Sequence, residues 1–283
     1  MILRAAPFTL DLTRPLIMGV INVTPDSFSD GGDHFDVAQA ITHAQRLVEE
    51  GADILDIGGE SSRPGAAPLP LDEELRRVLP VIESCVKLGK PVSVDTYKPE
   101  MMRAAVAAGA SMLNDIWGFQ RDGALKAALD AALQGVALCV MHMQRDPATM
   151  QDNPHYDDVV AEVRQFLAQR IDTLTQAGVP RQQIVIDPGF GFGKSVDHNL
   201  ALLRHLGQFN ALGVPVLAGL SRKSTIGRII GRDDPKDRIH GSVAAALIAA
   251  QNGATILRVH DVAATRDALA VLAAVQAAAP ESV

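Results

Sequence analysis

Eight short apolar runs recur along the 283-residue chain, each separated from the next by a segment with helical periodicity. The runs are "LIMGVINV" (16–23), "DILDIGG" (53–59), "PVSVD" (91–95), "SMLNDI" (111–116), "VALCVMH" (136–142), "IVIDPG" (184–189), "PVLAGL" (215–220) and "TILRVH" (255–260). The segment "VAQAITHAQRLVEEG" shows the helical spacing i, i+3, i+4, with Gly51 just past the helix end. Strand and helix alternating eight times require a parallel sheet, so we predict an α/β fold, a (β/α)8 TIM barrel.

A doubly wound open sheet could also hold eight strands, but it usually carries a glycine fingerprint after its first strand. Here that turn reads "TPDSFSD" (24–30), so the barrel is preferred. No linker, low-complexity stretch or charge run interrupts the pattern, and we expect residues 1–283 to form a single domain. Aromatic residues make up only 4% of the chain, so Ala, Leu, Val and Ile must fill its core.

The net charge of −7 provides no broad basic surface, which argues against binding to nucleic acid or to an anionic membrane. No apolar run is long enough for a signal peptide or for the ~18 residues of a membrane span. Cys85 and Cys139 have neither metal-site nor redox spacing. We therefore expect a soluble cytoplasmic protein with two free, buried thiols.

Polar residues stand at the carboxyl ends of the apolar runs, where barrel enzymes place their active sites. They are Asn22, Asp56, Glu60, Asp95, Asn114, Asp115, His142, Asp187, Ser221, Arg222, Lys223, Arg258, His260 and Asp261. An unpaired buried polar group costs ~1 to 3 kcal/mol, so this pattern predicts a polar cavity. Purely structural hydrogen bonds explain four of them equally well, namely Asp56, Asp115, His142 and Asp261.

Two groups of these side chains predict a ligand with a flat base and a phosphate-like tail. Asp95, Asn114 and Asp187 offer acceptors to the donor edge of a heterocycle. Lys223 can donate to its carbonyl or cover its ring. The second group suits an anion and consists of Asn22, Arg63, Arg258 and His260. The amide oxygen of Asn22 is a suitable ligand for Mg²⁺.

The stretch "PGFGFGKS" (188–195) invites comparison with a phosphate-binding loop. Its glycines, Gly189 and Gly193, are one residue too close for the G-x-x-x-x-G-K-[ST] pattern, and the stretch follows the sixth strand. We interpret it as a glycine-rich wall that allows a ligand to approach the backbone closely.

Eight motifs, in order along the whole chain, closely resemble the dihydropteroate synthase family. They are "MGVINVTPDSFSDGG" (18–32), "LDIGGESSRPG" (55–65), "SVDTYKP" (93–99), "LNDIWG" (113–118), "MHMQ" (141–144), "DPGFGFGK" (187–194), "GLSRKS" (219–224) and "LRVHDV" (257–262). The resemblance implies an enzyme that joins 6-hydroxymethyl-7,8-dihydropterin diphosphate to 4-aminobenzoate, releasing pyrophosphate and 7,8-dihydropteroate. It also implies Mg²⁺ bound by Asn22 and a homodimer formed through outer helices.

The resemblance further implies specific site residues. Those implied to be catalytic are Phe28, Arg63, Asp95 and Lys223. Those implied to bind substrate are Ser62, Arg63, Asp95, Asn114, Ile116, Met141, Asp187, Phe190, Gly219, Lys223, Ser224, Arg258 and His260. Two positions depart from the family: Ser62 replaces a usual Thr and keeps its hydroxyl, and Arg145 follows "MHMQ" where Gly is common.

Three other functions compete with this one. Lys223 would form a Schiff base in a barrel aldolase, but it follows Arg222 in a polar loop where a depressed pKa is not expected. A pterin-binding methyltransferase would share the pterin carboxylates without needing residues 24–30. A non-enzymatic pterin-binding paralogue would show gaps in the anion group, and the sequence has none.

Phe28 stands among Ser and Gly in the first of these motifs, where a ring gains little from folding alone. We predict that it covers the reactive methylene when substrate binds and excludes water from it. Phe28→Ala should raise the KM for 4-aminobenzoate and increase hydrolysis of the pterin diphosphate, while Tm and pterin affinity stay nearly unchanged. Steady-state kinetics and thermal unfolding test this. A lower Tm with equal harm to both substrates would instead make Phe28 a structural anchor.

Overall fold

The computed structural model describes residues 1–23, 33–60 and 68–278 and contains one eight-stranded parallel sheet. Its strands are β3 (Leu16–Asn22), β4 (Ile54–Gly58), β5 (Val92–Asp95), β6 (Met112–Asp115), β7 (Ala137–Met141), β8 (Ile184–Asp187), β9 (Leu217–Ala218) and β10 (Ile256–Val259). The strand order is β8-β7-β6-β5-β4-β3-β10-β9. A parallel bridge between Ile186 and Val216 joins the two edges and closes the sheet. The predicted (β/α)8 barrel is therefore confirmed.

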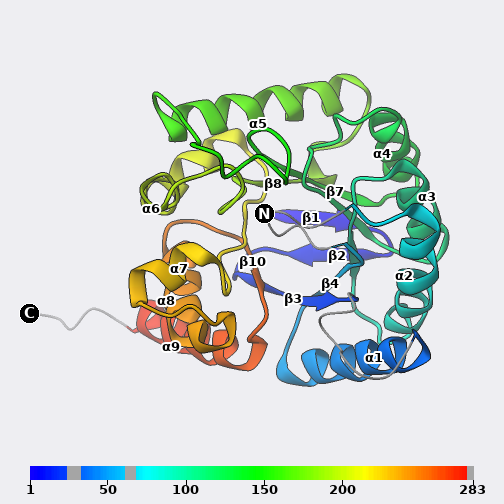
Figure 1. The fold of residues 1–283 in the computed structure, drawn as a ribbon, viewed down its shortest axis with the longest axis horizontal. Coiled ribbons are helices and arrows are strands. Elements are labelled where there is room, and N and C mark those ends of the chain that lie inside the picture. The colour runs from blue at the N-terminus through cyan, green and yellow to red at the C-terminus, as the bar shows by residue number, and fades with distance from the viewer. Residues whose placement is uncertain (24–32, 61–67, 279–283) are drawn as a thin grey trace, which may run out of the picture.

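Helices surround the barrel on its outer side (Figure 1). They are α1 (Asp33–Glu50), α2 (Leu71–Val86), α3 (Pro99–Ala107), α4 (Ala124–Ala132), α5 (Val159–Gln176), α6 (Val196–Arg204), α7 (Ser224–Ile230), α8 (Ile239–Gln251) and α9 (Val262–Ala277). Local sequence sets their ends. Asp158 caps α5 by accepting hydrogen bonds from two amides of its first turn, and Gly51 follows α1 with a φ of 104°.

Two apolar layers follow from the alternation of side chains along each strand. Leu55 and Ile57 face outward and pack with the helices, whereas Ile54 faces the barrel interior with Met18 and Met112. Asp56 lies between Leu55 and Ile57 and is in register with Ser93 on β5, so both face inward. The same alternation directs the polar residues at the carboxyl ends of the strands into the mouth of the barrel.

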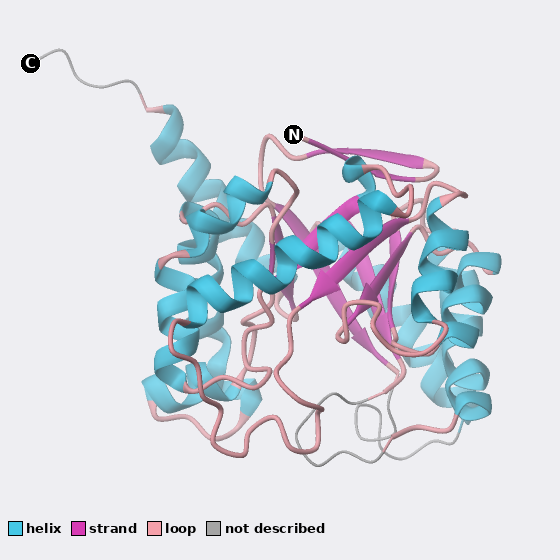
Figure 2. Ribbon diagram, turned by 90° about the horizontal axis from the view of Figure 1, so that it is seen from above, coloured by secondary structure: helices cyan, strands magenta, loops and turns pink. Residues whose placement is uncertain are grey.

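A β-hairpin that lies outside the predicted eightfold repeat covers the opposite end of the barrel. β1 (Ile2–Ala5) pairs with β2 (Phe8–Asp11) in antiparallel fashion, and Figure 2 shows this hairpin across one end of the sheet. Leu3, Ala5 and Leu12 pack into the barrel interior. Among the described residues, this plug buries the amino-terminal ends of the strands and leaves the polar mouth at the other end.

Cys85 and Cys139 are both free and buried, as predicted. Cys85 packs between the sheet and the helices, and Cys139 lies inside the barrel. Burial raises the pKa of Cys139 well above its usual value, so this thiol is unreactive. In the described part of the chain, no helix has the length and apolar character needed to cross a membrane.

Candidate functional site

Arg258 on β10 reaches into the barrel mouth and joins carboxylates from two other strands. Its Nε donates to Asp56 Oδ2 on β4 at 2.6 Å, and its Nη2 donates to Asp95 Oδ2 on β5 at 2.9 Å. Burial alone would lower the pKa of the guanidinium, but the two carboxylates outweigh this effect and raise it. Arg258 is therefore a fixed cation, held by charge-assisted hydrogen bonds on two sides.

The carboxyl group of Asp95 is tuned toward neutral pH. Burial raises its pKa to about 7, with Arg258 opposing this shift and the neighbouring Asp56 reinforcing it. A carboxyl that ionises near the working pH beside a fixed cation is typical of a binding or catalytic group. The sequence placed Asp95 in the site, and its predicted neighbour Asn114 lies directly beside it in register on β6.

Asp187 and Lys223 form a second pair of ionisable groups at the mouth. Asp187 Oδ1 accepts a hydrogen bond from the amide of Gly189 at 2.7 Å, and burial raises the pKa of Asp187 above its usual value. Burial lowers the pKa of Lys223 to about 8, while Asp187 opposes that shift. The expectation that this lysine keeps an ordinary pKa in a polar loop is therefore wrong, because its side chain lies in the barrel mouth.

Phe190 and Phe192 hold Lys223 in two different ways. The Lys223 Nζ donates to the carbonyl of Phe190 and lies 4.5 Å from the ring centroid of Phe192. The Phe190 ring is 1% exposed and packs in the layer between sheet and helices, away from the mouth. Only its backbone faces the site. Phe192 was not among the predicted site residues. Its sequence signal is the second ring of "GFGFG", two residues after the predicted Phe190.

Several atoms at the mouth are available to a ligand. The side-chain oxygen Oδ1 of Asn114 is buried and has no hydrogen-bond partner within the described residues. A buried acceptor without a partner costs about 1 to 3 kcal/mol, so a bound donor would relieve that cost. Gly219 leaves space between two residues of the mouth. A Cβ on Gly219 would lie 3.8 Å from the Arg258 side chain and 4.0 Å from Asp187 Oδ2.

One wall of the mouth is apolar. Its buried members are Ile116, Met141, Met150 and Phe192, and its partly buried members are Tyr97, Trp117 and Met143. Ile116 and Met141 were among the predicted substrate-binding residues, and the structure brings them into one cluster. Thioether and aromatic side chains beside paired carboxylates suit a flat heteroaromatic ring with a polar edge.

His260 lies at the end of β10 and is fixed by Ser221. Its Nδ1 is 3.0 Å from Ser221 Oγ, which also accepts a hydrogen bond from the His260 amide. Burial, reinforced by the charges of Arg258 and Arg222, lowers the pKa of His260 to about 3. The imidazole is therefore neutral near pH 7 and can offer a ring N–H, but no charge. Ser224 is exposed and begins α7.

Structural hydrogen bonds were an equally good explanation for four of the predicted polar residues, and they account for three of them. Asp115 accepts hydrogen bonds from the amides of Trp117 and Phe119, and Asp261 pairs with Arg222. His142 is buried and bonds to Lys194 through Nδ1 at 3.0 Å. The fourth, Asp56, holds Arg258 and so belongs to the site. An acidic residue in the middle of a buried strand was the sequence signal for it.

Arg145 illustrates the departure from the family's usual glycine. Its φ is 63°, in the left-handed region that glycine occupies at no steric cost. A residue with a Cβ pays about 1 to 2 kcal/mol for this conformation. Its guanidinium donates to the carbonyl of Asp152 at 2.6 Å, which offsets part of that cost.

Some predicted residues lie outside the described ranges, namely Phe28, Ser62 and Arg63. Asn22 lies within the described residues: it is partly buried, ends β3 and is in register with Gly58 on β4. The described residues contain no group of three or more His, Cys, Asp or Glu that could hold a metal ion.

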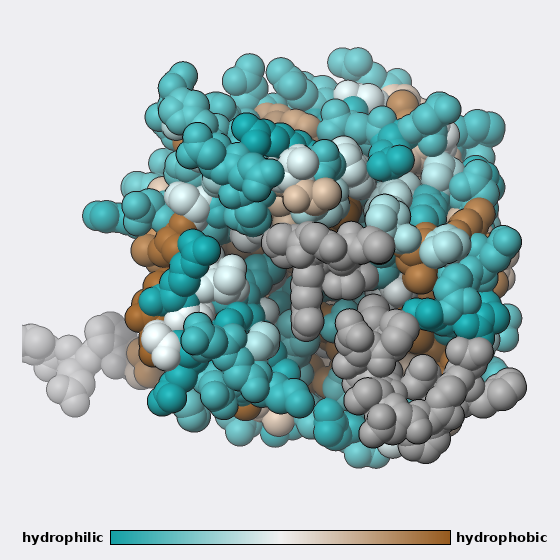
Figure 3. All heavy atoms as spheres, in the orientation of Figure 1, coloured by the Kyte–Doolittle hydropathy of each residue, from teal (hydrophilic) through white to brown (hydrophobic). Residues whose placement is uncertain are grey.

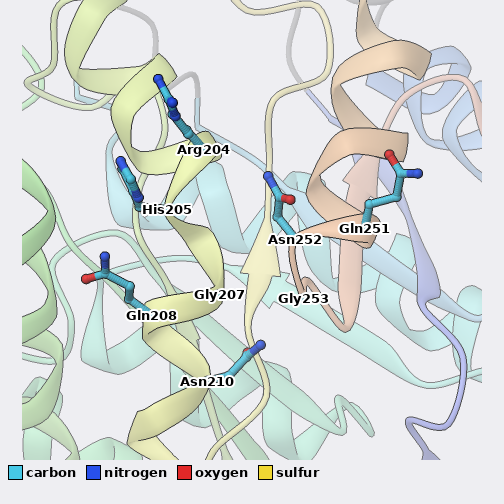
Figure 4. Close-up of a pocket in the computed structure, with 8 residues that line it drawn as sticks. All are labelled: Arg204, His205, Gly207, Gln208, Asn210, Gln251, Asn252 and Gly253. Atoms are coloured by element: carbon cyan, nitrogen blue, oxygen red, sulfur yellow. The ribbon is translucent and has the colours of Figure 1, made fainter.

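A hollow of about 480 Å³ lies away from these residues (Figure 4). It is lined by Arg204, His205, Gly207, Gln208, Asn210, Gln251, Asn252 and Gly253. These residues lie at the carboxyl ends of α6 and α8 and in the connections from them to β9 and β10, so they lie toward the amino-terminal ends of the strands. No predicted site residue borders the hollow, and the chemistry belongs to the opposite end of the barrel.

Comparison with known proteins decides the family. A family described as "Pterin binding enzyme" matches residues 18–260, and the dihydropteroate synthase of Escherichia coli K12 is 47% identical, covering 94% of this chain and 93% of its own length. The chain belongs to the dihydropteroate synthase family. A solved Xanthomonas albilineans dihydropteroate synthase holding 4-aminobenzoic acid is 57% identical, with a TM-score of 0.92 over 99% of this chain and 100% of that one. A complex from the same organism holds 7,8-dihydropteroate, with 55% identity and a TM-score of 0.90 over 99% and 100% of the two chains.

The pKa values of Asp95 and Lys223 predict a pH optimum for ligand binding in this member of the dihydropteroate synthase family. In its ionised form, above about pH 7, Asp95 can accept hydrogen bonds from the donor edge of a heterocycle, whereas Lys223 loses its proton above about pH 8. Affinity for a pterin fragment without diphosphate should therefore rise with pH through 7 and fall above 8, by up to about tenfold per pH unit. Calorimetry across the pH range measures this.

Asp95→Asn is the control for that profile, because it keeps the shape of the side chain and removes its ionisation. The variant should bind more weakly and lose the rising limb while keeping the falling one. A rising limb that persists in Asp95→Asn would assign the titration to another group.

Proposed function

We propose that this chain condenses 6-hydroxymethyl-7,8-dihydropterin diphosphate with 4-aminobenzoate to give 7,8-dihydropteroate and pyrophosphate. The observation that carries the proposal is the barrel mouth itself. Two carboxyl groups, an amide and a lysine converge there beside an apolar wall and a fixed arginine. Similarity to dihydropteroate synthases over nearly the full length of both chains supports the same conclusion.

The pterin ring occupies the space between the apolar wall and the carboxyl groups in this proposal. Asp95, Asn114 and Asp187 accept hydrogen bonds from its donor edge, and Lys223 donates to its carbonyl. The unpartnered Oδ1 of Asn114 then gains a donor. Met141 and Phe192 contact the ring faces, since both belong to the apolar wall.

The reaction breaks the bond between the pterin methylene carbon and the diphosphate oxygen, and the electron pair leaves with the diphosphate. Arg258 and a neutral His260 bind the departing diphosphate and stabilise its growing charge. The cation that remains is delocalised into the electron-rich pterin, whose donor edge stays bonded to Asp95 and Asp187. The substitution is therefore S_N1-like.

The amine of 4-aminobenzoate then attacks the methylene carbon, forming the carbon–nitrogen bond. Its nitrogen becomes acidic only after that bond forms, so the proton passes to water without a strong base. Phe28, Ser62 and Arg63 lie outside the described residues, and the proposal assigns them to this substrate. Ser224, next to Lys223 in the sequence, begins α7.

Mg²⁺ is the proposed metal, with Asn22 as its protein ligand. This ion commonly keeps several waters and binds substrate phosphates, so it needs only one or two protein oxygens. The amide of Asn22 at the end of β3 fits that requirement. When bound, Mg²⁺ would neutralise part of the charge on the diphosphate.

The direct test is an assay of pyrophosphate release from the purified protein with pterin diphosphate, 4-aminobenzoate and Mg²⁺. We expect release to depend on all three and to yield dihydropteroate in equal amount. Release that is independent of 4-aminobenzoate and of Mg²⁺ would exclude the synthase reaction. A borohydride-reduced adduct on Lys223 would instead favour the aldolase, and we expect its mass to be unchanged.

A homodimer through α7, α8 and α9 is also proposed. These helices pack against one another and expose large apolar side chains, namely Ile229, Ile230, Ile248, Val271 and Val275. Figure 3 shows hydrophobic residues along the edge of the molecule where Figure 1 places these helices. A large exposed apolar patch is typical of a protein interface, and a second copy of the chain would cover it.

Val271→Asp should weaken the dimer by about tenfold or more, because it buries an unpaired carboxylate in the interface. Leu133→Asp is the matched control, since Leu133 is 87% exposed at the end of α4, outside this patch. Sedimentation equilibrium measures both. Equal dimerisation of the two variants would place the interface elsewhere.

A further inference from the structure

Lys194 is a buried lysine that the proposed reaction does not use. Its side chain is 3% exposed, and its Nζ lies 2.9 Å from the carbonyl oxygens of Gly189 and Phe192 and 3.0 Å from His142 Nδ1. The carbonyl of His142 is a longer contact, at 3.4 Å. Within the described residues, none of these partners is a carboxylate. Burial lowers the pKa of Lys194 well below its usual value, which leaves hydrogen bonds as its main support.

These contacts explain why "PGFGFGKS" is not a phosphate-binding loop. In such a loop, backbone N–H groups point at the anion and the lysine reaches the phosphates. Here two carbonyls of the segment converge on its own lysine instead. Gly189, Gly191 and Gly193 have φ values of 71°, 78° and 63°, which turn the chain into this shape. A Cβ on Gly189 would lie 1.9 Å from the carbonyl oxygen of His142.

Three further polar groups of the segment bond to side chains outside it. Gln151 donates to the carbonyl of Gly191 at 2.6 Å, and Tyr156 donates to that of Gly193 at 2.9 Å. Asn199 Oδ1 accepts from the amide of Gly191 at 2.7 Å. Side chains from outside therefore hold Gly191 and Gly193, while Lys194 bonds to Gly189 and Phe192.

The segment in turn fixes Lys223. The carbonyl of Phe190 accepts from Lys223 Nζ, and the ring of Phe192 lies beneath the same nitrogen. Within the segment, Lys194 bonds to Gly189 and Phe192. These two residues flank Phe190, whose carbonyl accepts the hydrogen bond from Lys223. A Cβ on Gly191 would lie only 3.1 Å from the Lys223 side chain, which shows how closely the segment approaches it.

We propose that Lys194 is a positioning residue for pterin binding. It organises residues 188–193 so that the Phe190 carbonyl and the Phe192 ring hold Lys223 beside Asp187. The proposal rests on the pterin-binding role proposed above for Lys223 and Asp187. It adds a residue that touches no substrate and acts through the shape of the glycine-rich segment.

Lys194→Met tests the proposal, because it keeps the length of the side chain and removes the nitrogen. We expect the affinity for a pterin fragment to fall about tenfold. This factor corresponds to the loss of one or two hydrogen bonds, counted as their net contribution. The KM for pterin diphosphate should rise equally. The KM for 4-aminobenzoate at saturating pterin, and kcat, should change by less than about threefold.

Gln183→Met is the matched control. Gln183 is also buried, and its Nε2 donates to the carbonyls of Ala132 and Val136 at 3.0 and 3.3 Å, toward the amino-terminal end of the strands. This variant should lower Tm without changing either KM. If Lys194→Met does not fold, Asn199→Ala removes another support of the same segment and should give the same kinetic pattern.

Lys223→Met separates failure of this inference from failure of the proposed pterin site. Suppose that Lys223→Met lowers the affinity for the pterin fragment, while Lys194→Met lowers only Tm, as Gln183→Met does. Lys194 is then merely structural and the inference is wrong. An equal rise in the KM values for both substrates in Lys194→Met would overturn the inference as well. If Lys223→Met binds the fragment normally, the proposed pterin contact itself fails.

Discussion

The ion pairs of Arg258 with Asp56 and Asp95 hold together the mouth of the barrel. Asp56 is fully buried, so removing Arg258 would leave an uncompensated charge in the interior. The resulting loss of stability would be much larger than that from breaking a surface ion pair. The three residues come from three different strands, so the contacts fix the strands' polar ends relative to one another. The shape of the binding surface above them depends on this arrangement.

Burial favours the neutral form of four ionisable groups around that centre. It raises the pKa of Asp95 and Asp187 and lowers that of Lys223 and His260. Opposite charges limit the shifts of Asp95 and Lys223, which end at about 7 and about 8. Two groups that change charge within a narrow pH range around neutrality are therefore placed in the same barrel mouth.

The glycine-rich segment shows that composition does not decide the direction of backbone hydrogen bonding. The same residue types that expose amides to a phosphate in one loop turn carbonyls inward to a lysine in this one. The difference arises from tertiary contacts, since Gln151, Tyr156 and Asn199 come from other segments and select one conformation. Rigidity near the proposed pterin site is consequently a property of several parts of the chain.

The sequence by itself determined the barrel and the end of it that carries the polar residues. Side-chain alternation and helical periodicity are local, and eight repeats leave few topologies, so the predicted strand limits agree with the observed ones to within two residues. Only the tertiary structure decided which charges meet. Asp56 and Arg258 are 202 residues apart, and no local pattern reports a contact over that distance. Packing likewise decided that Phe190 faces the core and Phe192 the site, because a ring's direction in a glycine-rich turn depends on the space that neighbouring elements leave.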